Sequence, residues 1–309
     1  MESNKSTHVI LFFLTFLTLT YSDIFLNPDV PQTLTNYKLY FFVNWPYSVT
    51  LLLILFGHEM GHYLPARYYG VRASLPYFIP LPFGPIGTMG AVIKIKDQIP
   101  NKKVLFDIGV GGPAVSLILS LIVWIIGISL SKVVEIPSDL DRSSFLFFGD
   151  SLFTYFSTQW ILGPVNFDLM DIQAHPLAKA GWVGLLITAI NLLPFGQLDG
   201  GHVIYSMFGE SYRKWIHILF GFFLIFALIH FTWLIWCFLI YYLLRIEHPF
   251  IKDAINGIGK TRFMFGVFIL VSFLIIFVPK PIILGSEYDN PSLLGDLFRL
   301  IVKTVGISE

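Results

Sequence analysis

The chain has 309 residues, of which 55% are hydrophobic, 17% aromatic and only 13% charged. A soluble domain normally carries about 25% charged residues, so this composition favours a protein that crosses the membrane several times. Twenty basic residues balance twenty acidic ones, which argues against nucleic acid as a partner, and the single cysteine, Cys237, excludes a disulfide framework and a cysteine-based zinc site.

Apolar stretches near the length of a membrane-spanning helix, roughly 20 residues, recur along the chain. We expect helices at Val9–Tyr21, Phe41–Leu64, Val104–Leu130, Ala180–Leu198 and Phe263–Val278. The first of these is short, and we interpret it as a retained helix because no small-residue cleavage site follows it. A further stretch, Trp215–Leu244, is either one long helix or two short ones that meet near His230.

The charges of the connecting segments predict how these helices are oriented. Residues 67–103 hold six lysines and arginines against one acidic residue, Asp97, which is typical of a cytoplasmic connection. Residues 135–171 are acidic and suit the outer side, whereas residues 245–262 are again basic on balance. This alternation requires two helices within Trp215–Leu244, and it gives seven spans with the N-terminus inside.

The segment Leu75–Asp97 is apolar but contains four prolines and three glycines, so a regular helix is implausible there. Two extended arms that meet around Gly84–Gly87 are typical of a hairpin, and the end of the segment alternates apolar and charged residues as a half-buried strand does. Non-helical backbone at membrane depth requires cover by protein or a wet cavity. We therefore predict a re-entrant β-hairpin that lines a cavity; an interfacial loop is the alternative.

The whole chain, residues 1–309, is predicted to form one all-α polytopic membrane domain of about six to seven spans plus this hairpin. The expected parts are an N-terminal helix at 9–21, a catalytic core at about 41–205, C-terminal helices at 213–278 and a tail at 279–309. Small residues at 109–114 would let a second helix approach closely.

The strongest chemical signal is the motif H-E-x-x-H, formed by His58, Glu59 and His62. Residues four apart lie on one face of a helix, so both imidazoles reach one metal ion, while Glu59 is rotated by about 100° and stays free to handle a water molecule. Three ionisable groups in a membrane helix are costly, which favours a function for them. This arrangement is typical of metal-assisted peptide hydrolysis.

A catalytic zinc ion usually takes three protein ligands, and Asp199 is our candidate for the third. It follows an apolar helix that runs from the outer side towards the cytoplasm, and so it reaches the side where His58 and His62 lie. Pro194 and nearby glycines predict local unwinding, which frees Asn191 and Asp199 to face the interior.

These two motifs, H-E-x-x-H at 58–62 and N-x-x-P-x-x-x-L-D-G at 191–200, resemble the site-2 protease family of intramembrane zinc metalloproteases. The similarity covers roughly Phe41–Tyr205 and is greatest to the branch related to the plastid members of plants, without a PDZ or regulatory domain. The resemblance implies one zinc ion held by His58, His62 and Asp199. It also implies that Glu59 is the general base and that Asn191 stabilises the oxyanion or holds the substrate backbone.

The family hydrolyses peptide bonds in or near transmembrane segments, so the expected partners are such segments and the lipid bilayer. A substrate helix must unwind before cleavage, and we expect the strand Val92, Ile93, Lys94 and Ile95 to pair with the unwound segment. Because no plastid transit segment precedes the first helix, we expect a prokaryotic cytoplasmic membrane, with the active site towards the cytoplasm.

Other functions remain open at this stage. A metal or solute transporter would use the same histidine and aspartate cluster, but it would need ionisable residues along a path across the bilayer. A di-iron oxidase would need about eight clustered histidines. An inactive homologue that acts as a binding module is disfavoured by the intact Glu59 and Asp199. His202 is either a partner of the site or a helix-end residue, whereas His217 is expected in the core and His248 in a loop.

Overall fold

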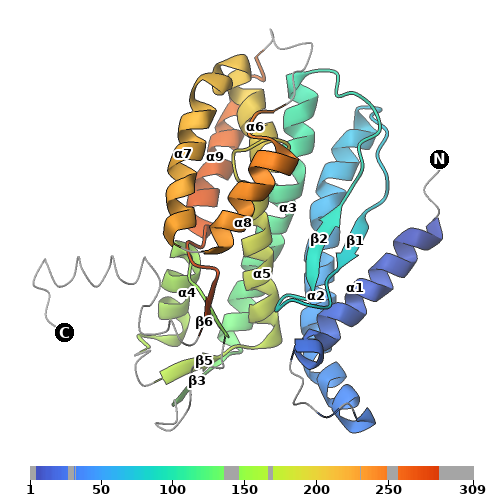
Figure 1. Ribbon diagram of the computed structural model, residues 1–309, viewed down its shortest axis with the longest axis vertical. Helices are drawn as coiled ribbons and strands as arrows, with labels where there is room; N and C mark the ends of the chain where they lie inside the picture. Colours follow the sequence, from blue (N-terminus) through green and yellow to red (C-terminus); the bar gives the residue numbers. More distant parts are fainter. Residues whose placement is uncertain are drawn as a thin grey trace, which may run out of the picture.

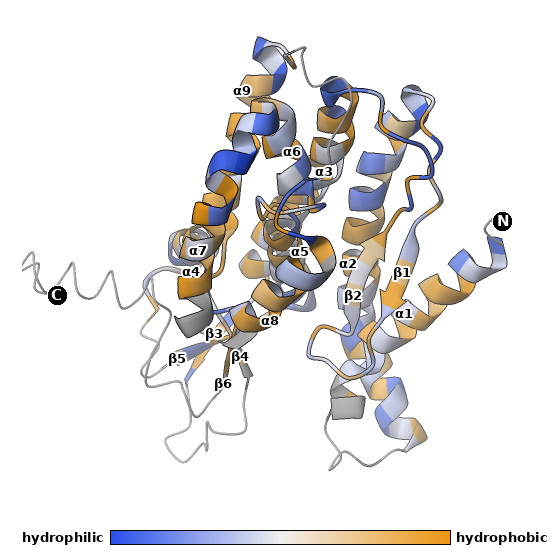
Figure 2. Ribbon diagram, turned by 45° about the horizontal axis from the view of Figure 1, so that its top comes forward, coloured by the Kyte–Doolittle hydropathy of each residue, from blue (hydrophilic) through white to orange (hydrophobic). Residues whose placement is uncertain are grey.

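The computed structural model describes residues 5–26, 31, 33–135, 146–165, 170–229, 231–248 and 257–284. This part of the chain is mostly helical (Figure 1). Two of its helices, α2 (Leu34–Tyr68) and α3 (Lys102–Ser129), are long and apolar enough to cross a membrane by length and composition. Figure 2 shows apolar residues along the middle of the helices and hydrophilic residues gathered towards the upper end of the molecule.

The other helices are α1 (Lys5–Leu26), α4 (Leu152–Leu162), α5 (Pro176–Asn191), α6 (Asp199–Phe208), α7 (Arg213–Ile229), α8 (Phe231–Leu239) and α9 (Lys260–Ile276). A 3₁₀ turn, η2 (Gly209–Tyr212), precedes α7, and a π-helical turn, η3 (Ile240–Leu244), follows α8. The strands are β1 (Tyr77–Pro80), β2 (Thr88–Val92), β3 (Lys132–Glu135), β4 (Leu146–Phe148), β5 (Met170–Gln173) and β6 (Ile282–Leu284).

Most of the expected spans are confirmed as helices, with bounds that differ by a few residues. The expected helix Ala180–Leu198 is wrong at both ends, because α5 begins at Pro176 and ends at Asn191. Proline suits a first helical position, and the His175 ring accepts the Leu177 N–H, so together they start the helix early. The stretch Trp215–Leu244 contains two helices, as its charge pattern requires; their junction at His230 lies outside the described residues.

The break between α5 and α6 is the predicted unwinding at Pro194. The N–H of Leu193 donates to the carbonyl of Ile190 and is the last backbone N–H that bonds to α5. Gly196 then adopts a left-handed conformation (φ 54°), and its N–H donates to the carbonyl of Ile246 at 3.0 Å. Side chains other than glycine rarely adopt that conformation, and a Cβ there would collide with the backbone at Leu244. Helix α6 begins immediately afterwards, at Asp199.

The predicted hairpin is confirmed as a pair of strands, whereas its re-entrant position and its lining of a cavity remain predictions. Strands β1 and β2 pair antiparallel, with Tyr77 opposite Val92 and Phe78 opposite Ala91. Beyond β2 the pairing continues, because the Ser74 N–H donates to the Lys94 carbonyl. The hairpin lies beside α1 and α2 (Figure 1). It therefore forms one wall next to the helix that carries His58.

The connection that was expected on the outer side contains structure that the sequence did not predict. Helix α4 starts with a reciprocal cap between Ser151 and Thr154. Strand β3 pairs with β5, and β4 pairs with β6 from the expected tail. The prediction of an all-α protein with one hairpin was therefore too narrow, since two small sheets lie at the end of the molecule opposite α6 (Figure 1). Residues 285–309 of the tail lie outside the described part.

Helix α3 packs against both α2 and α5 and occupies the centre of the molecule (Figure 1). Its crossing with α2 is made at Gly61, Gly111 and Gly112. A Cβ on Gly61 would lie 2.7 Å from the carbonyl carbon of Gly111 and 2.9 Å from the Cα of Gly112. The expected close approach at the small-residue run is thus confirmed, and it brings the backbones of α2 and α3 into contact.

We predict that Gly61→Ala lowers the stability of the protein by about 1–3 kcal/mol, because the added methyl group must push two backbones apart. The matched control is Gly221→Ala on α7, where nothing lies within 4 Å of an added Cβ. That change should raise stability slightly, by about 0.5–1 kcal/mol. Unfolding midpoints of both variants in one detergent measure the difference, and equal effects would contradict the tight crossing.

Candidate metal centre

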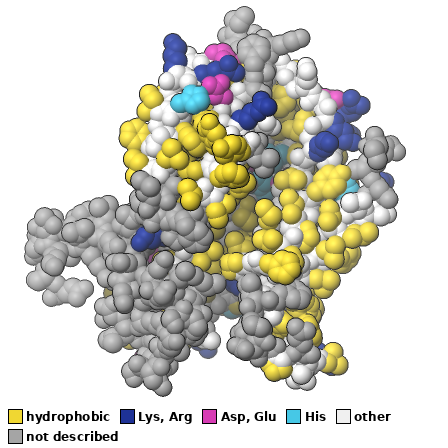
Figure 3. Space-filling model, in the orientation of Figure 1, with side chains coloured by type: hydrophobic (Ala, Val, Ile, Leu, Met, Phe, Trp, Pro, Cys, Tyr) yellow, Lys and Arg dark blue, Asp and Glu magenta, His cyan; other side chains and the backbone are white. Residues whose placement is uncertain are grey.

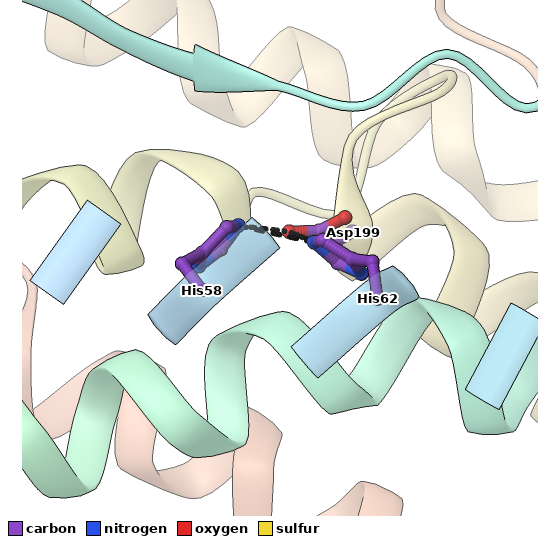
Figure 4. Close-up of side chains that lie close together, drawn as sticks. All are labelled: His58, His62 and Asp199. Atoms are coloured by element: carbon purple, nitrogen blue, oxygen red, sulfur yellow. Dashed lines mark hydrogen bonds and ion pairs between the residues drawn. The ribbon is translucent and has the colours of Figure 1, made fainter. Parts of the chain in front are cut away.

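His58, His62 and Asp199 converge on one point, as Figure 4 shows. The Nε2 atoms of the two histidines lie 3.1 Å apart, and each lies 3.3 Å from Oδ2 of Asp199. The two imidazoles come from successive turns of α2, and the carboxylate comes from the first residue of α6. The structure therefore brings together the three residues that the sequence proposed as ligands.

The spacing of these three atoms fits a zinc ion. Zinc binds imidazole nitrogen and carboxylate oxygen at about 2.0–2.2 Å in tetrahedral geometry, which places neighbouring ligand atoms about 3.3–3.5 Å apart. The observed triangle has sides of 3.1, 3.3 and 3.3 Å. A tetrahedron with three protein ligands leaves one position open, which is the arrangement of catalytic sites.

The other ring nitrogen of each histidine is bound to an oxygen atom. Nδ1 of His62 lies 2.7 Å from the carbonyl oxygen of Ile108, which can only accept, so Nδ1 carries a hydrogen. The lone pair of His62 Nε2 then points into the cluster. Such outer partners orient metal-binding imidazoles in many metalloproteins.

A chain of hydroxyl groups does the same for His58. Its Nδ1 lies 2.9 Å from Oγ of Ser116, which lies 2.8 Å from Oγ1 of Thr188, which in turn lies 2.7 Å from the carbonyl oxygen of Gly184. The Gly184 carbonyl can only accept, so the single hydroxyl hydrogen of Thr188 is donated to it, and Thr188 accepts from Ser116. Ser116 then accepts from Nδ1–H of His58. His58 Nε2 therefore presents its lone pair to the cluster, and three electron-pair donors face one point.

The site is buried and its surroundings are shaped for it. The relative exposures of His58 and His62 are 4% and 8%. A Cβ on Gly112 would collide with the His62 ring, so glycine leaves the space that the ring occupies. Asp199 lies in the first turn of α6, where the positive end of the helix dipole favours a carboxylate.

The two predicted catalytic residues lie next to this cluster. Glu59 is 4% exposed, and the backbone N–H of Ile93 is within hydrogen-bonding reach of its carboxylate. Asn191 is the last residue of α5, and its Nδ2 lies 3.4 Å from His58 Nε2. Both residues are thus at distances from which they can contact a substrate held at the metal.

The predicted substrate strand, Val92, Ile93, Lys94 and Ile95, lies on the Glu59 side of the hairpin. Its register decides which edge is free. Lys94 accepts from Ser74 and Lys96 donates to Arg72, so the even-numbered residues use their backbone groups within the hairpin. The N–H of Ile93 faces Glu59 instead. By the alternation of a strand, the backbone groups of Ile95 point to the same outer edge.

The peptidase family M50 model matches residues 46–229, which is more than half of the chain. The chain belongs to peptidase family M50. It is 34% identical over 189 residues to the probable zinc metalloprotease EGY1, chloroplastic, of Arabidopsis thaliana, covering 60% of this chain and 34% of that protein. It is 28% identical over 240 residues to the probable zinc metalloprotease EGY2, chloroplastic, of the same plant, covering 76% of this chain and 42% of that protein.

A further relative is EGY1 of Oryza sativa subsp. japonica, 37% identical over 177 residues, covering 57% of this chain and 29% of that protein. The chain therefore spans between 29% and 42% of the length of these three relatives. The matched M50 segment contains His58, His62 and Asp199, so the family assignment and the metal geometry concern the same residues.

Sequence reasoning missed the partners that orient the histidines of this M50 site. Ser116 lies two residues after the small residues at 109–114, which were interpreted as packing alone, and Thr188 lies in an apolar helix. Both hydroxyls are fully or nearly fully buried, with exposures of 2% and 0%. The only sequence signal for these partners was a serine or threonine within each apolar span, and such residues commonly bond to a carbonyl of their own helix.

We predict that Ser116→Ala weakens zinc binding by about 10–100-fold, because His58 loses the oxygen that fixes its ring. The control is Ser129→Ala on the same helix, whose exposed hydroxyl bonds to the carbonyl of Ile125 in its own helix. Competition with a zinc chelator measures both affinities. Equal zinc affinity in the two variants would contradict the orienting role of Ser116.

Proposed function

We propose that this M50 protein is a zinc-dependent endopeptidase that hydrolyses peptide bonds in or near transmembrane segments of other membrane proteins. One observation carries the proposal: three lone-pair donors lie at the spacing of a three-ligand zinc site, with a buried carboxylate beside them. His58, His62 and Asp199 would hold one zinc ion per chain. Family membership and the names of the relatives support zinc as the metal.

When bound, zinc supplies Lewis acidity, which makes water more acidic and polarises a carbonyl group. Glu59 takes the proton from the attacking water and delivers it to the leaving amine as the peptide bond breaks. The amide of Asn191 donates a hydrogen bond to the carbonyl oxygen as negative charge develops on it. The apolar surroundings strengthen both interactions because they exclude bulk water.

The hairpin offers a means of presenting the substrate. A transmembrane helix hides its carbonyl groups in hydrogen bonds, so a segment must become extended before cleavage. At the outer edge of the strand, the carbonyl of Ile93 and the backbone groups of Ile95 face away from the hairpin, where an added strand could pair with them. Because Ile93 also contacts Glu59, a segment paired along this edge would run past the catalytic carboxylate.

The partners and the membrane are part of the proposal. We propose transmembrane protein segments as substrates, the lipid bilayer as the surroundings and no nucleic acid. The basic segment 67–103 supports a site that opens towards the cytoplasmic side. The relatives are chloroplastic, whereas the sequence-based expectation is a prokaryotic cytoplasmic membrane.

A transporter is the less favoured alternative. Within the described residues, the group able to hold a metal is His58, His62 and Asp199, which lie at one depth. A translocation path would need further groups along the bilayer normal, and α5 is lined by small and apolar residues in its buried part.

We predict that Glu59→Gln keeps zinc and lowers the rate of cleavage by about 10²–10⁴-fold, because only proton transfer is removed. Zinc per chain, measured by plasma mass spectrometry, and cleavage of a model membrane-spanning substrate test this together. His58→Ala and Asp199→Ala should lose zinc as well as activity. Undiminished cleavage by Glu59→Gln would refute the assigned mechanism.

The hairpin hypothesis has its own test. We predict that Ile95→Pro lowers cleavage of a membrane-spanning substrate by about tenfold or more, because proline removes one N–H from the outer edge. Ile95→Ala keeps that N–H and is the control for the side chain. If both variants cleave at the same rate, the strand does not hold the substrate by backbone pairing.

A further inference from the structure

A cavity of about 560 Å³ lies where α7 begins and η3 ends, apart from the metal centre. Six of its lining residues are polar, namely Arg213, His217, Tyr241, Arg245, Glu247 and His248. Figure 3 shows basic, acidic and histidine side chains gathered at the upper end of the molecule, above a broad apolar surface. The cavity therefore combines charged groups with a position at the edge of the apolar region.

Among the residues that the structure describes, the ion pairs of the cavity leave Arg245 without a counterion. Arg213 lies 3.1 Å from Glu210 and 3.4 Å from Glu247, and His217 lies 2.8 Å from Glu247. Within the part of the chain that the structure describes, Arg245 forms no ion pair. Arg213 is balanced by Glu210 and Glu247, so the guanidinium of Arg245 is the group in this cavity that can attract an anion.

The backbone of Arg245 is strained. Its φ of 62° and ψ of 152° fall in a region that essentially only glycine adopts without cost. Within the described residues it is the one position other than glycine with positive φ. It directly follows the π-helical turn η3, a feature that is frequent at functional sites. Glycine would fit this backbone better, so the chain keeps the arginine side chain at an energetic cost.

The floor of the cavity is tied to the segment that carries Asp199. The carbonyl of Ile246, which also lines the cavity, accepts the N–H of Gly196 at 3.0 Å and the Tyr212 hydroxyl at 3.0 Å. His248 Nε2 lies 2.7 Å from Nδ1 of His202, one turn along α6 from Asp199. The cavity wall and the break between α5 and α6 therefore form one connected unit.

We infer that this cavity binds a phosphate group, supplied by an anionic phospholipid or by a soluble phosphate. Arg245 and Arg213 are the donors, because guanidinium groups match phosphate oxygens in geometry and charge. Basic pockets between membrane helices on the cytoplasmic side commonly receive lipid headgroups, and Tyr241 and Ile246 supply an apolar wall. Occupancy would hold residues 245–248 and, through Ile246, the segment that leads to Asp199.

The test uses native mass spectrometry of the full chain in a neutral detergent, with short-chain phosphatidylglycerol in one arm and inorganic phosphate in the other. Arg245→Gly removes the guanidinium and relieves the strained backbone, so it should fold at least as stably as the wild type. We expect its affinity for the bound phosphate compound to fall by about tenfold or more, the effect of losing a charged hydrogen bond. Arg245→Lys keeps the charge and should bind within a few-fold of the wild type.

Lys214→Ala is the matched control, because it removes one positive charge next to Arg213 from an exposed side chain outside the cavity. It should leave the affinity unchanged. Binding of phosphatidylglycerol alone supports a lipid as the ligand, and binding of inorganic phosphate supports a soluble one. Binding of neither, or equal loss in Arg245→Gly and Lys214→Ala, overturns the site.

Hydrogen exchange tests the connection to Asp199. The bound phosphate compound should slow exchange at residues 192–201 in the wild type and not in Arg245→Gly. Binding without slower exchange at these residues would overturn the connection.

Discussion

Three electron-pair donors lie 3.1–3.3 Å apart inside an apolar helical protein, and the packing of the surrounding helices keeps them there. Such a cluster is costly without a cation, because lone pairs repel and the surroundings offer little solvation. The fold nevertheless holds each of the three side chains in place through contacts on the side away from the cluster. A carbonyl oxygen orients His62, a pair of hydroxyls orients His58, and the start of a helix favours the charge of Asp199.

These demands explain two irregular features of the helices. Helix α3 supplies both the Ile108 carbonyl and Ser116, so it must approach α2 at backbone contact, which Gly61 and Gly112 permit. The chain must also stop α5 and start α6 within the site, because Asn191 and Asp199 are needed at two different helix ends. Pro194 and the left-handed Gly196 produce that break, and the Ile246 carbonyl holds it in place.

Much of this arrangement was predictable from the sequence because it depends on local rules. The spacing of His58 and His62 requires one helix face, prolines exclude helix between Leu75 and Asp97, and Pro194 predicts unwinding. The parts that were not predictable depend on long-range pairing. Strand β4 pairs with β6 across more than a hundred residues, and no local pattern marks three-residue strands.

The surroundings of the site were hidden for the same reason. His248 lies in a loop, as expected, but it is buried against His202. His217 was expected in the core, but it is exposed and paired with Glu247. Each depends on a partner about 30 residues or more away along the chain. The ligands themselves were found because their residue types are rare in apolar helices, whereas Ser116 and Thr188 are ordinary there.

The central claim is that His58, His62 and Asp199 together bind one zinc ion. X-ray absorption spectroscopy at the zinc edge tests it most directly on the purified full chain. The account predicts two imidazole nitrogens and carboxylate or water oxygens at about 2.0–2.2 Å, and loss of the bound zinc in His62→Ala. A spectrum without imidazole scattering, or one unchanged in His62→Ala, would contradict it.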